Sequence, residues 1–363
     1  MSGPTPVQIF HMEEKRKQYR SGSFFLKISL LALFLLVPFL FPSFKTVDLA
    51  MQIIIFGALV ASFDILLGYT GILSFGHGMF FGLGAYCMAF LIGKYGMPSY
   101  SNLILGFVVA ATASAVLALL ISLLTLRVKA IFFSMITLAI AELAIVLTTK
   151  LSGLTGGEDG ISFSTPGIFS VSYSMGEFMG IEITGKIITY YFILLSCLAL
   201  FVAMLRFTHS PLGRILQAIR DNAQRAEALG NKTFVYQSIS ITFGCVVAAL
   251  IGALYAMWME YVNPESSLGV MTIMLDVLLM VIIGGMGTLY GGIIGAAFLK
   301  ITQTFLPDLQ SLAKHLFPQS ELLHNILERW LLLFGILFIL VVIFFPKGVI
   351  GSLQEYRLRK KKL

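Results

Sequence analysis

Long apolar runs recur along nearly the whole chain, and they limit its possible folds more than any other feature. A helix that crosses the hydrocarbon layer of a membrane needs about 20 consecutive, mostly apolar residues. Only 12% of the residues are charged, whereas soluble domains carry about 25%. The sequence therefore predicts an all-α polytopic membrane protein.

About ten transmembrane helices are expected from the positions of these runs. The segments between the runs are too short to enclose a core of their own, which predicts a single membrane domain over residues 24–346. A polar tail, 1–23, precedes this domain, and a basic tail, 347–363, follows it. The first run is expected to stay as an uncleaved signal-anchor, because no small-residue cleavage pattern follows it. The expected spans are 24–41, 47–67, 72–93, 103–126, 130–149, 187–205, 233–256, 272–285, 288–305 and 330–345.

Lysine and arginine orient the chain, because loops that remain in the cytoplasm keep an excess of positive charge. If the N-terminus is cytoplasmic, most of the 25 basic residues fall in segments on that side, while Lys300 is counted with the outer segments. Both termini are therefore expected in the cytoplasm. The net charge of +7 then reflects membrane topology and contact of the basic tail with anionic lipid, and no nucleic-acid binding is expected.

The cytoplasmic stretch 210–230 has the pattern of an amphipathic helix. Ser210 is a suitable N-cap, Pro211 suits the first helical position, and Gly230 suits the helix end. Such a helix either docks into a partner protein or lies in the lipid interface. Its apolar residues recur at helical spacing and share one face: Leu212, Ile215, Leu216, Ile219, Ala223 and Ala226.

A glycine-rich stretch, 68–86, lies inside the membrane region. Gly78 and Gly82 form a small-xxx-small step, which predicts close helix packing. Ser74 and His77 are candidates for the translocation path, because unwound backbone is tolerated at membrane depth where it lines a cavity. The alternative for His77 is a hydrogen-bonded side chain in a packing seam.

A second glycine-rich stretch, 284–295, is not a nucleotide-binding loop. Tyr290 stands where a Gly-x-Gly-x-x-Gly pattern needs its third glycine, and no Gly-Lys-Ser/Thr follows. Gly287, Gly291 and Gly295 recur every four residues, so they are expected to share one helix-packing face.

Three acidic residues, Asp64, Glu142 and Asp276, fall within predicted spans. A carboxylate at mid-membrane costs roughly 2.5–3.5 kcal/mol on insertion scales, so such a group usually faces protein or water. Glu142 is nearest the middle of its span and is a candidate for the translocation path or for a bond to a neighbouring helix.

The longest segment outside the spans, 150–186, either docks an extracytoplasmic partner or folds over the bundle as a connector. The second to fifth and the seventh to tenth spans run in opposite senses in this topology, and each set holds a glycine-rich short helix. This arrangement predicts an inverted repeat, which is common in transporters.

Five motifs in one order make the chain resemble the LivM-type permeases of branched-chain amino acid ABC importers. The resemblance extends from about residue 47 to 350. The motifs are Gly-Tyr-Thr-Gly-Ile-Leu-Ser-Phe-Gly-His-Gly (68–78), Thr-Gly-Gly-Glu-Asp-Gly (155–160), Ser-Pro-Leu-Gly-Arg-Ile-Leu-Gln-Ala-Ile-Arg-Asp-Asn (210–222), Ala-Glu-Ala-Leu-Gly (226–230) and Ile-Gly-Gly-Met-Gly-Thr-Leu-Tyr-Gly (283–291).

The resemblance implies a permease subunit of the inner membrane that forms part of a path for branched-chain or related amino acids. It implies a second, LivH-like permease, two LivG- and LivF-like ATPase subunits that bind the ATP, and an extracytoplasmic substrate-binding protein. No cofactor is expected in this chain. The resemblance also implies that 210–230 touches an ATPase through Ser210, Pro211, Leu212, Gly213, Arg214, Ala218, Arg220, Glu227 and Gly230.

Other functions remain open at this point. Permeases of urea or amide ABC importers share the same framework. A secondary transporter would couple an ion through Glu142 or Asp276. An intramembrane enzyme would need Ser74 and His77 on one helix face, but no second acid–base partner and no metal-ligand spacing accompany them. Neither catalytic residues nor a metal site are therefore expected.

Overall fold

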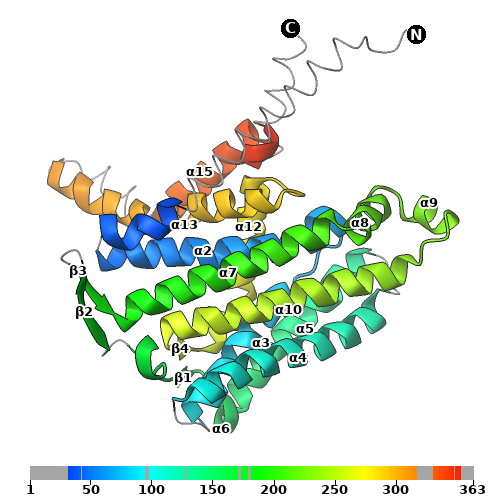
Figure 1. Ribbon diagram of the computed structural model, residues 1–363. Helices are drawn as coiled ribbons and strands as arrows, with labels where there is room; N and C mark the ends of the chain where they lie inside the picture. The colour runs from blue at the N-terminus through cyan, green and yellow to red at the C-terminus, as the bar shows by residue number, and fades with distance from the viewer. Residues whose placement is uncertain are drawn as a thin grey trace, which may run out of the picture. The chain divides into compact units, whose positions relative to one another are not determined.

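The computed structural model describes residues 32–41, 43–94, 98–126, 128, 130–170, 173–178, 181–316, 330–346 and 348–352. The chain divides into two compact units, Met1–Ala50 and Met51–Leu363. The first unit contains a helix over 32–40 and the start of the next helix. The second unit contains the rest of that helix and every other element discussed below (Figure 1).

Seven helices among the described residues are long and apolar enough to cross a membrane. They match the second, fourth to seventh, ninth and tenth predicted spans. The helix in the second span is continued by a π-helical turn, η1 (Ile65–Tyr69). The seven are α2 (Phe44–Asp64), α4 (Tyr100–Thr125), α5 (Ala130–Lys150), α7 (Gly185–His209), α10 (Thr233–Met259), α13 (Leu289–Leu316) and α15 (Trp330–Phe344).

The third and eighth predicted spans are shorter apolar helices. The first is α3 (His77–Ala89) with η2 (Phe90–Lys94), and the second is η4 (Val270–Met274) with α12 (Leu275–Gly284). The expected start of the third span at residue 72 is wrong, because 71–74 have no regular structure. The first span, 24–41, and both tails lie mostly outside the described residues. The total of ten spans, the orientation and the inverted repeat stay predictions.

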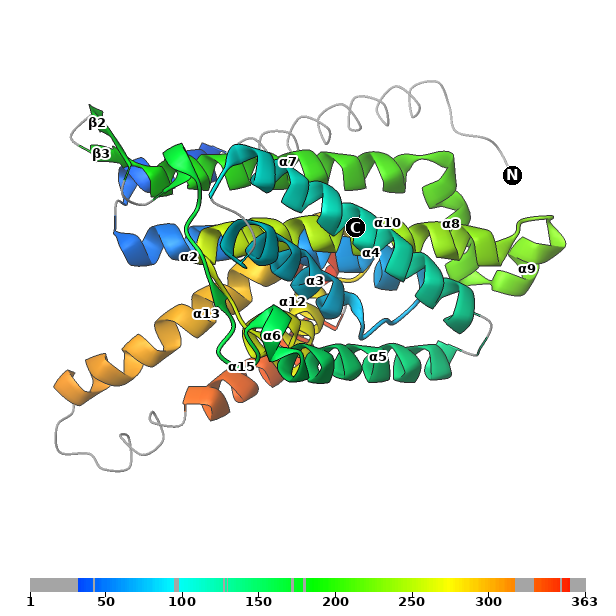
Figure 2. The same ribbon diagram turned by 90° about the horizontal axis from the view of Figure 1, so that it is seen from below.

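The core of the second unit lies where α3 packs against α10 and α4. A Cβ atom added to Gly84 would overlap the carbonyl oxygen of Ala249, and one added to Gly252 would overlap that of Phe81. The absence of side chains at these two positions therefore lets α3 and α10 approach backbone to backbone. Figures 1 and 2 show α10 running beside α7 and α4.

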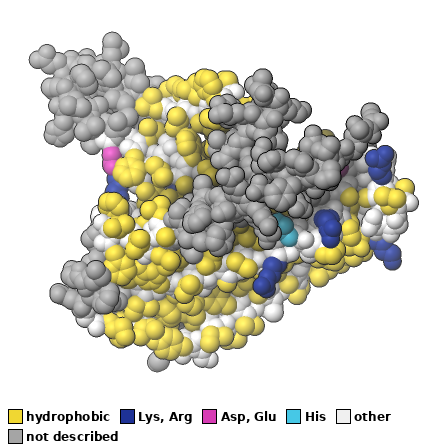
Figure 3. Space-filling model, turned by 45° about the horizontal axis from the view of Figure 1, so that its top comes forward, with side chains coloured by type: hydrophobic (Ala, Val, Ile, Leu, Met, Phe, Trp, Pro, Cys, Tyr) yellow, Lys and Arg dark blue, Asp and Glu magenta, His cyan; other side chains and the backbone are white. Residues whose placement is uncertain are grey.

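The outer helices α4 and α5 are mostly exposed, and large apolar side chains such as Leu124 and Ile131 project from them. An apolar surface of this kind is expected against lipid or another subunit. On the face seen in Figure 3, hydrophobic side chains cover much of the described part, and basic side chains gather toward the end that carries the segment 210–230. This distribution agrees with the charge bias that predicts a cytoplasmic location for that end.

The segment 150–186 folds onto the opposite end of the bundle. Its strand β1 pairs antiparallel with β4 (Tyr261–Val262), which follows α10, and β2 pairs with β3. The short strands qualify the expectation of an all-α chain. The elements of the segment are α6 (Ser152–Thr155), β1 (Ile161–Ser162), η3 (Gly167–Phe169), β2 (Ser174–Phe178) and β3 (Ile181–Thr184).

This segment is anchored by apolar and polar contacts with the bundle. Ile161 and Phe163 are buried in the cluster that contains Met88. The backbone N–H and the hydroxyl of Thr165 both donate to Oε1 of Glu260, at 3.0 and 2.6 Å. Such packing is what the connector interpretation requires.

Candidate functional site

The stretch 210–230 forms two short helices, α8 (Pro211–Asp221) and α9 (Ala223–Ala228). Ser210 caps α8 as predicted, because its Oγ accepts a hydrogen bond from the backbone N–H of Gly213 at 3.3 Å. The expectation of one continuous helix is wrong. Asn222 has extended backbone, and its Oδ1 accepts from the N–H of Arg225 at 2.9 Å, so it starts a second helix.

The two helices keep an apolar face toward the bundle. Leu216, Ile219 and Ala226 are buried, as the spacing predicts. Ala223 is exposed, because the break at residue 222 turns α9 relative to α8. The predicted shared face is therefore interrupted at Ala223 and continues at Ala226, while Arg214 and Ala218 are exposed and available to a partner.

The absence of a side chain at Gly213 lets α8 pack closely against the end of α7. A Cβ atom at this position would overlap the carbonyl oxygen of Thr208. At the other end of the segment, Gly230 has the positive φ of 87° that suits a helix end, and Glu227 accepts a hydrogen bond from the hydroxyl of Thr233. The segment is thus attached to both α7 and α10.

Arg220 connects α8 to the end of the α2 span. Its Nη1 donates to the carbonyl oxygen of Gly68 in η1, while Nε and Nη2 donate to Oδ1 of Asp221 at 3.2 and 3.1 Å. The backbone N–H of Gly287 donates to Oδ1 of Asp64 at 2.8 Å. A Cβ atom on Gly68 would overlap the backbone nitrogen of Gly287.

These contacts join three parts of the chain, and we call Asp64, Gly68, Arg220 and Gly287 the coupling junction. Sequence analysis identified each residue in a separate role and missed the junction. No local pattern indicates that residues more than 150 positions apart meet. The available signal was a charged residue at the end of an apolar span, which usually needs a protein partner.

Gly287 does not share a helix face with Gly291 and Gly295, so that expectation is wrong. It lies in the turn before α13, with a φ of 80°. Gly291 and Gly295 do lie in α13, where added Cβ atoms would overlap the backbone of α12. These two glycines therefore permit close packing of α12 and α13.

Ser74 and His77 do not share a helix face, because Ser74 precedes α3. Nε2 of His77 lies 2.9 Å from Oγ of Ser62, and the ring centroid lies 5.4 Å from that of Phe63. His77 is only 1% exposed. The imidazole is thus enclosed by the bundle, which favours the packing interpretation and removes the geometry that a Ser74–His77 pair would need.

The other predicted packing face, on α3, lies against the chain that follows α10. A Cβ atom on Gly82 would overlap the side chain of Leu268. One on Gly78 would lie 3.5 Å from Cβ of Met274, an ordinary contact. A side chain would therefore be tolerated less well at Gly82 than at Gly78.

The acidic residues of the spans have different surroundings. Glu142 is exposed on α5 and makes no hydrogen bond or ion pair with another described residue. Asp276 forms an ion pair with Lys300, and its Oδ2 lies 3.0 Å from Nζ of the lysine. Lys300 is buried in α13, so counting it with the outer segments was wrong. Within the described part of the chain, no group of three His, Cys, Asp or Glu residues could hold a metal ion.

Comparison with known proteins identifies the family. Residues 45–342 match the family model described as the permease component of branched-chain amino acid transport systems. The high-affinity branched-chain amino acid transport system permease protein LivM of Escherichia coli is 28% identical over 338 residues, which cover 89% of this chain and 74% of the relative. The probable LivM of Methanocaldococcus jannaschii is 24% identical, over 72% of this chain and 71% of that relative. No solved structure matches significantly. The chain therefore belongs to the family of branched-chain amino acid transport permeases.

Proposed function

We propose that this chain is a permease subunit of an inner-membrane ABC importer for branched-chain amino acids. Membership of the permease family carries the proposal, and the exposed α8–α9 segment gives a separate ATPase a place to act. The other components are a second permease, LivH-like, two ATPase subunits of the LivG and LivF kind, and an external binding protein. This chain supplies half of the path and hydrolyses no ATP.

The coupling junction offers a mechanical route from the ATPase to the membrane helices. A movement of α8 that the ATPase imposes on its exposed face also moves Arg220. Arg220 is hydrogen-bonded to Gly68 in η1, which continues α2. Gly68 in turn touches Gly287, at the start of α13. Rigid movement of α2 and α13 with α8 would open one side of the path and close the other, as alternating access requires.

The function is tested by reconstituting the chain with its second permease, ATPases and binding protein in proteoliposomes. We expect leucine uptake that requires ATP on the ATPase side and stops when this chain is omitted. Uptake by the chain alone, driven by an ion gradient, would instead identify a secondary transporter. Uptake of urea in preference to leucine would identify the related class of importer.

Charge reversal at Arg214 tests the docking of α8. Arg214 is exposed beside the apolar face of α8, so the Arg214→Glu variant is expected to lose most of the co-purifying ATPase and about tenfold in ATP-driven uptake. Membrane insertion should not change. The matched control is Lys232→Glu, which reverses an exposed charge just beyond the segment. Normal uptake and ATPase recovery in Arg214→Glu would contradict the proposed contact.

Glu142 is exposed in the middle of α5. An unpaired carboxylate in mid-span is unfavourable against lipid, so we expect α5 to face the second permease or the path. A cysteine at this position, in a cysteine-free background, should react with a charged, membrane-impermeant thiol reagent in the assembled complex. Protection of Glu142→Cys both with and without substrate would count against a water-filled path there.

A further inference from the structure

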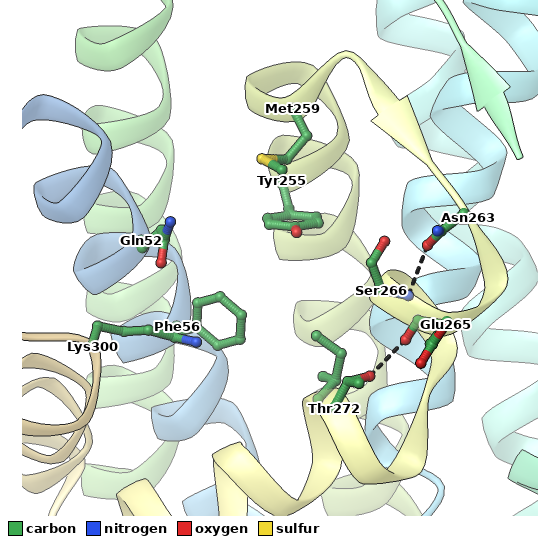
Figure 4. Close-up of a pocket in the computed structure, with 10 residues that line it drawn as sticks. Gln52, Phe56, Tyr255, Met259, Asn263, Glu265, Ser266, Thr272 and Lys300 are labelled. Atoms are coloured by element: carbon green, nitrogen blue, oxygen red, sulfur yellow. Dashed lines mark hydrogen bonds between the residues drawn. The ribbon is translucent and has the colours of Figure 1, made fainter. Parts of the chain in front are cut away.

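A cavity of about 330 Å³ lies beside the end of α10 that is distant from α8. It is bounded by α2, α10, α13 and the chain over 263–273. Figure 4 shows Phe56 and Lys300 on one wall, with Glu265 and Thr272 on the opposite wall. Ligand pockets range from about 300 to 1,000 Å³, so this cavity suits a small molecule.

Lys300 brings a positive charge to the first wall. Its Nζ donates to Oδ2 of Asp276 at 3.0 Å and to Oε1 of Gln303 at 3.1 Å. The same nitrogen lies 4.0 Å from the ring centroid of Phe56, which lines the cavity. An ammonium group has three donors. Two are used by Asp276 and Gln303, so one remains for a carboxylate that enters the cavity lined by Lys300 and Phe56.

Glu265 brings a negative charge to the opposite wall, on α11 (Pro264–Leu268). Two hydrogen bonds between side chains and the backbone hold this short helix in place. Oδ1 of Asn263 accepts from the N–H of Ser266 at 2.8 Å, and the hydroxyl of Thr272 donates to the carbonyl oxygen of Glu265 at 2.6 Å. Neither bond uses the exposed carboxylate of Glu265, which is thus placed to accept an ammonium group.

The rest of the lining combines the apolar groups of Tyr255, Met259 and Ile273 with three uncharged polar side chains, Gln52, Asn263 and Ser266. The ring of Tyr255 is held by Phe56 and Phe81, with centroid distances of 6.3 and 5.1 Å. Opposite charges on facing walls, with apolar surface between them, match a molecule that has both charges and a compact apolar side chain.

The motif at 155–160 supports the rim of the cavity. Gly160 has a φ of 72°, and a Cβ atom there would overlap the carbonyl oxygen of Val262 and crowd Asn263. Asn263 lines the cavity and caps α11. The segment over 150–186 thus packs on the residues that position Glu265.

We propose that this cavity binds a zwitterionic amino acid with an apolar side chain, its carboxylate toward Lys300 and its ammonium group toward Glu265. The choice of an amino acid as the ligand rests on the proposed function. The two opposed charges and the apolar lining are independent of that choice. In this arrangement the permease itself selects for both charged ends of its substrate.

The test is equilibrium binding to the purified full chain in lipid nanodiscs, without the other subunits. The probes are L-leucine, 4-methylpentanoate, which lacks the ammonium group, and leucinamide, which lacks the carboxylate. We expect saturable binding of leucine and binding at least about tenfold weaker for either analogue. Absence of saturable leucine binding by the wild-type chain would overturn the site.

Two variants assign the charged ends. Glu265→Gln should weaken leucine binding about five- to tenfold and leave 4-methylpentanoate unchanged. The double variant Lys300→Met with Asp276→Asn removes the opposite charge without leaving Asp276 unpaired, and it should weaken leucine while sparing leucinamide. Lys232→Met, which removes an exposed charge far from the cavity lining, is the control and should change nothing.

If Glu265→Gln weakens the binding of 4-methylpentanoate as much as that of leucine, the assignment of the ammonium end is overturned. If the double variant weakens the binding of leucinamide as much as that of leucine, the assignment of the carboxylate end is overturned. The binding assay needs no ATPase, so its outcome is separate from that of the importer proposal. Leucine binding without ATP-driven uptake would refute the importer alone, and ATP-driven uptake without binding in the cavity would refute the site alone.

Discussion

The Arg220→Gln variant is expected to lower ATP-driven uptake by roughly ten- to a hundredfold while the complex continues to hydrolyse ATP. Arg220 donates from a charged group to the backbone carbonyl of Gly68, and this bond joins α8 to η1. A hydrogen bond of this kind contributes about 1.5–3 kcal/mol, which corresponds to that range of population change. Loss of the bond would let α8 move without α2.

Uptake and ATP hydrolysis should be measured on the same proteoliposomes. Arg225→Gln is the matched control, because it removes the same charge from α9, away from the bonded Arg220–Gly68 pair. An equal fall in uptake for both variants would show that net charge matters and the junction does not. A fall in hydrolysis parallel to uptake would indicate failed docking of the ATPase instead of uncoupling.

The Lys300→Met variant is expected to lose about 3–5 kcal/mol of stability, because it leaves Asp276 without its cation inside the bundle. Lys300 is buried and Asp276 is half-buried, so water cannot readily replace the lost partner. Adding Asp276→Asn should restore most of the stability, since the unpaired charge is then removed. Both effects on stability are measured by thermal unfolding and by denaturant unfolding of the purified variants in the same detergent.

Lys150→Met is the control for the lost lysine itself, because Lys150 is exposed at the end of α5. It should change stability by less than about 0.5 kcal/mol. If the double variant is no more stable than Lys300→Met, the ion pair does not explain the loss. The contact of the Lys300 ammonium group with the face of the Phe56 ring would then account for it.

Local features of the chain were predicted well wherever the deciding interactions are local. Ser210 and Pro211 mark the start of α8, because a cap and a fixed φ act within one helical turn. Asn222 has the same capping ability, and its role as a break was missed because the apolar spacing continues through it. The glycine periodicity was misleading at Gly287, since spacing alone cannot distinguish a helix from the turn before it.

By itself, the sequence determined that the chain spans a membrane many times, where its long apolar helices lie and which segment is amphipathic. These properties follow from the length of apolar runs and from charge, which need no knowledge of neighbours. Only the tertiary structure decided that Arg220 meets Gly68, that Asp276 pairs with Lys300, and that Lys300 faces Glu265 across a cavity. Such contacts join residues far apart in the chain, and they depend on how the helices cross, which in turn depends on close packing at positions such as Gly84 and Gly252.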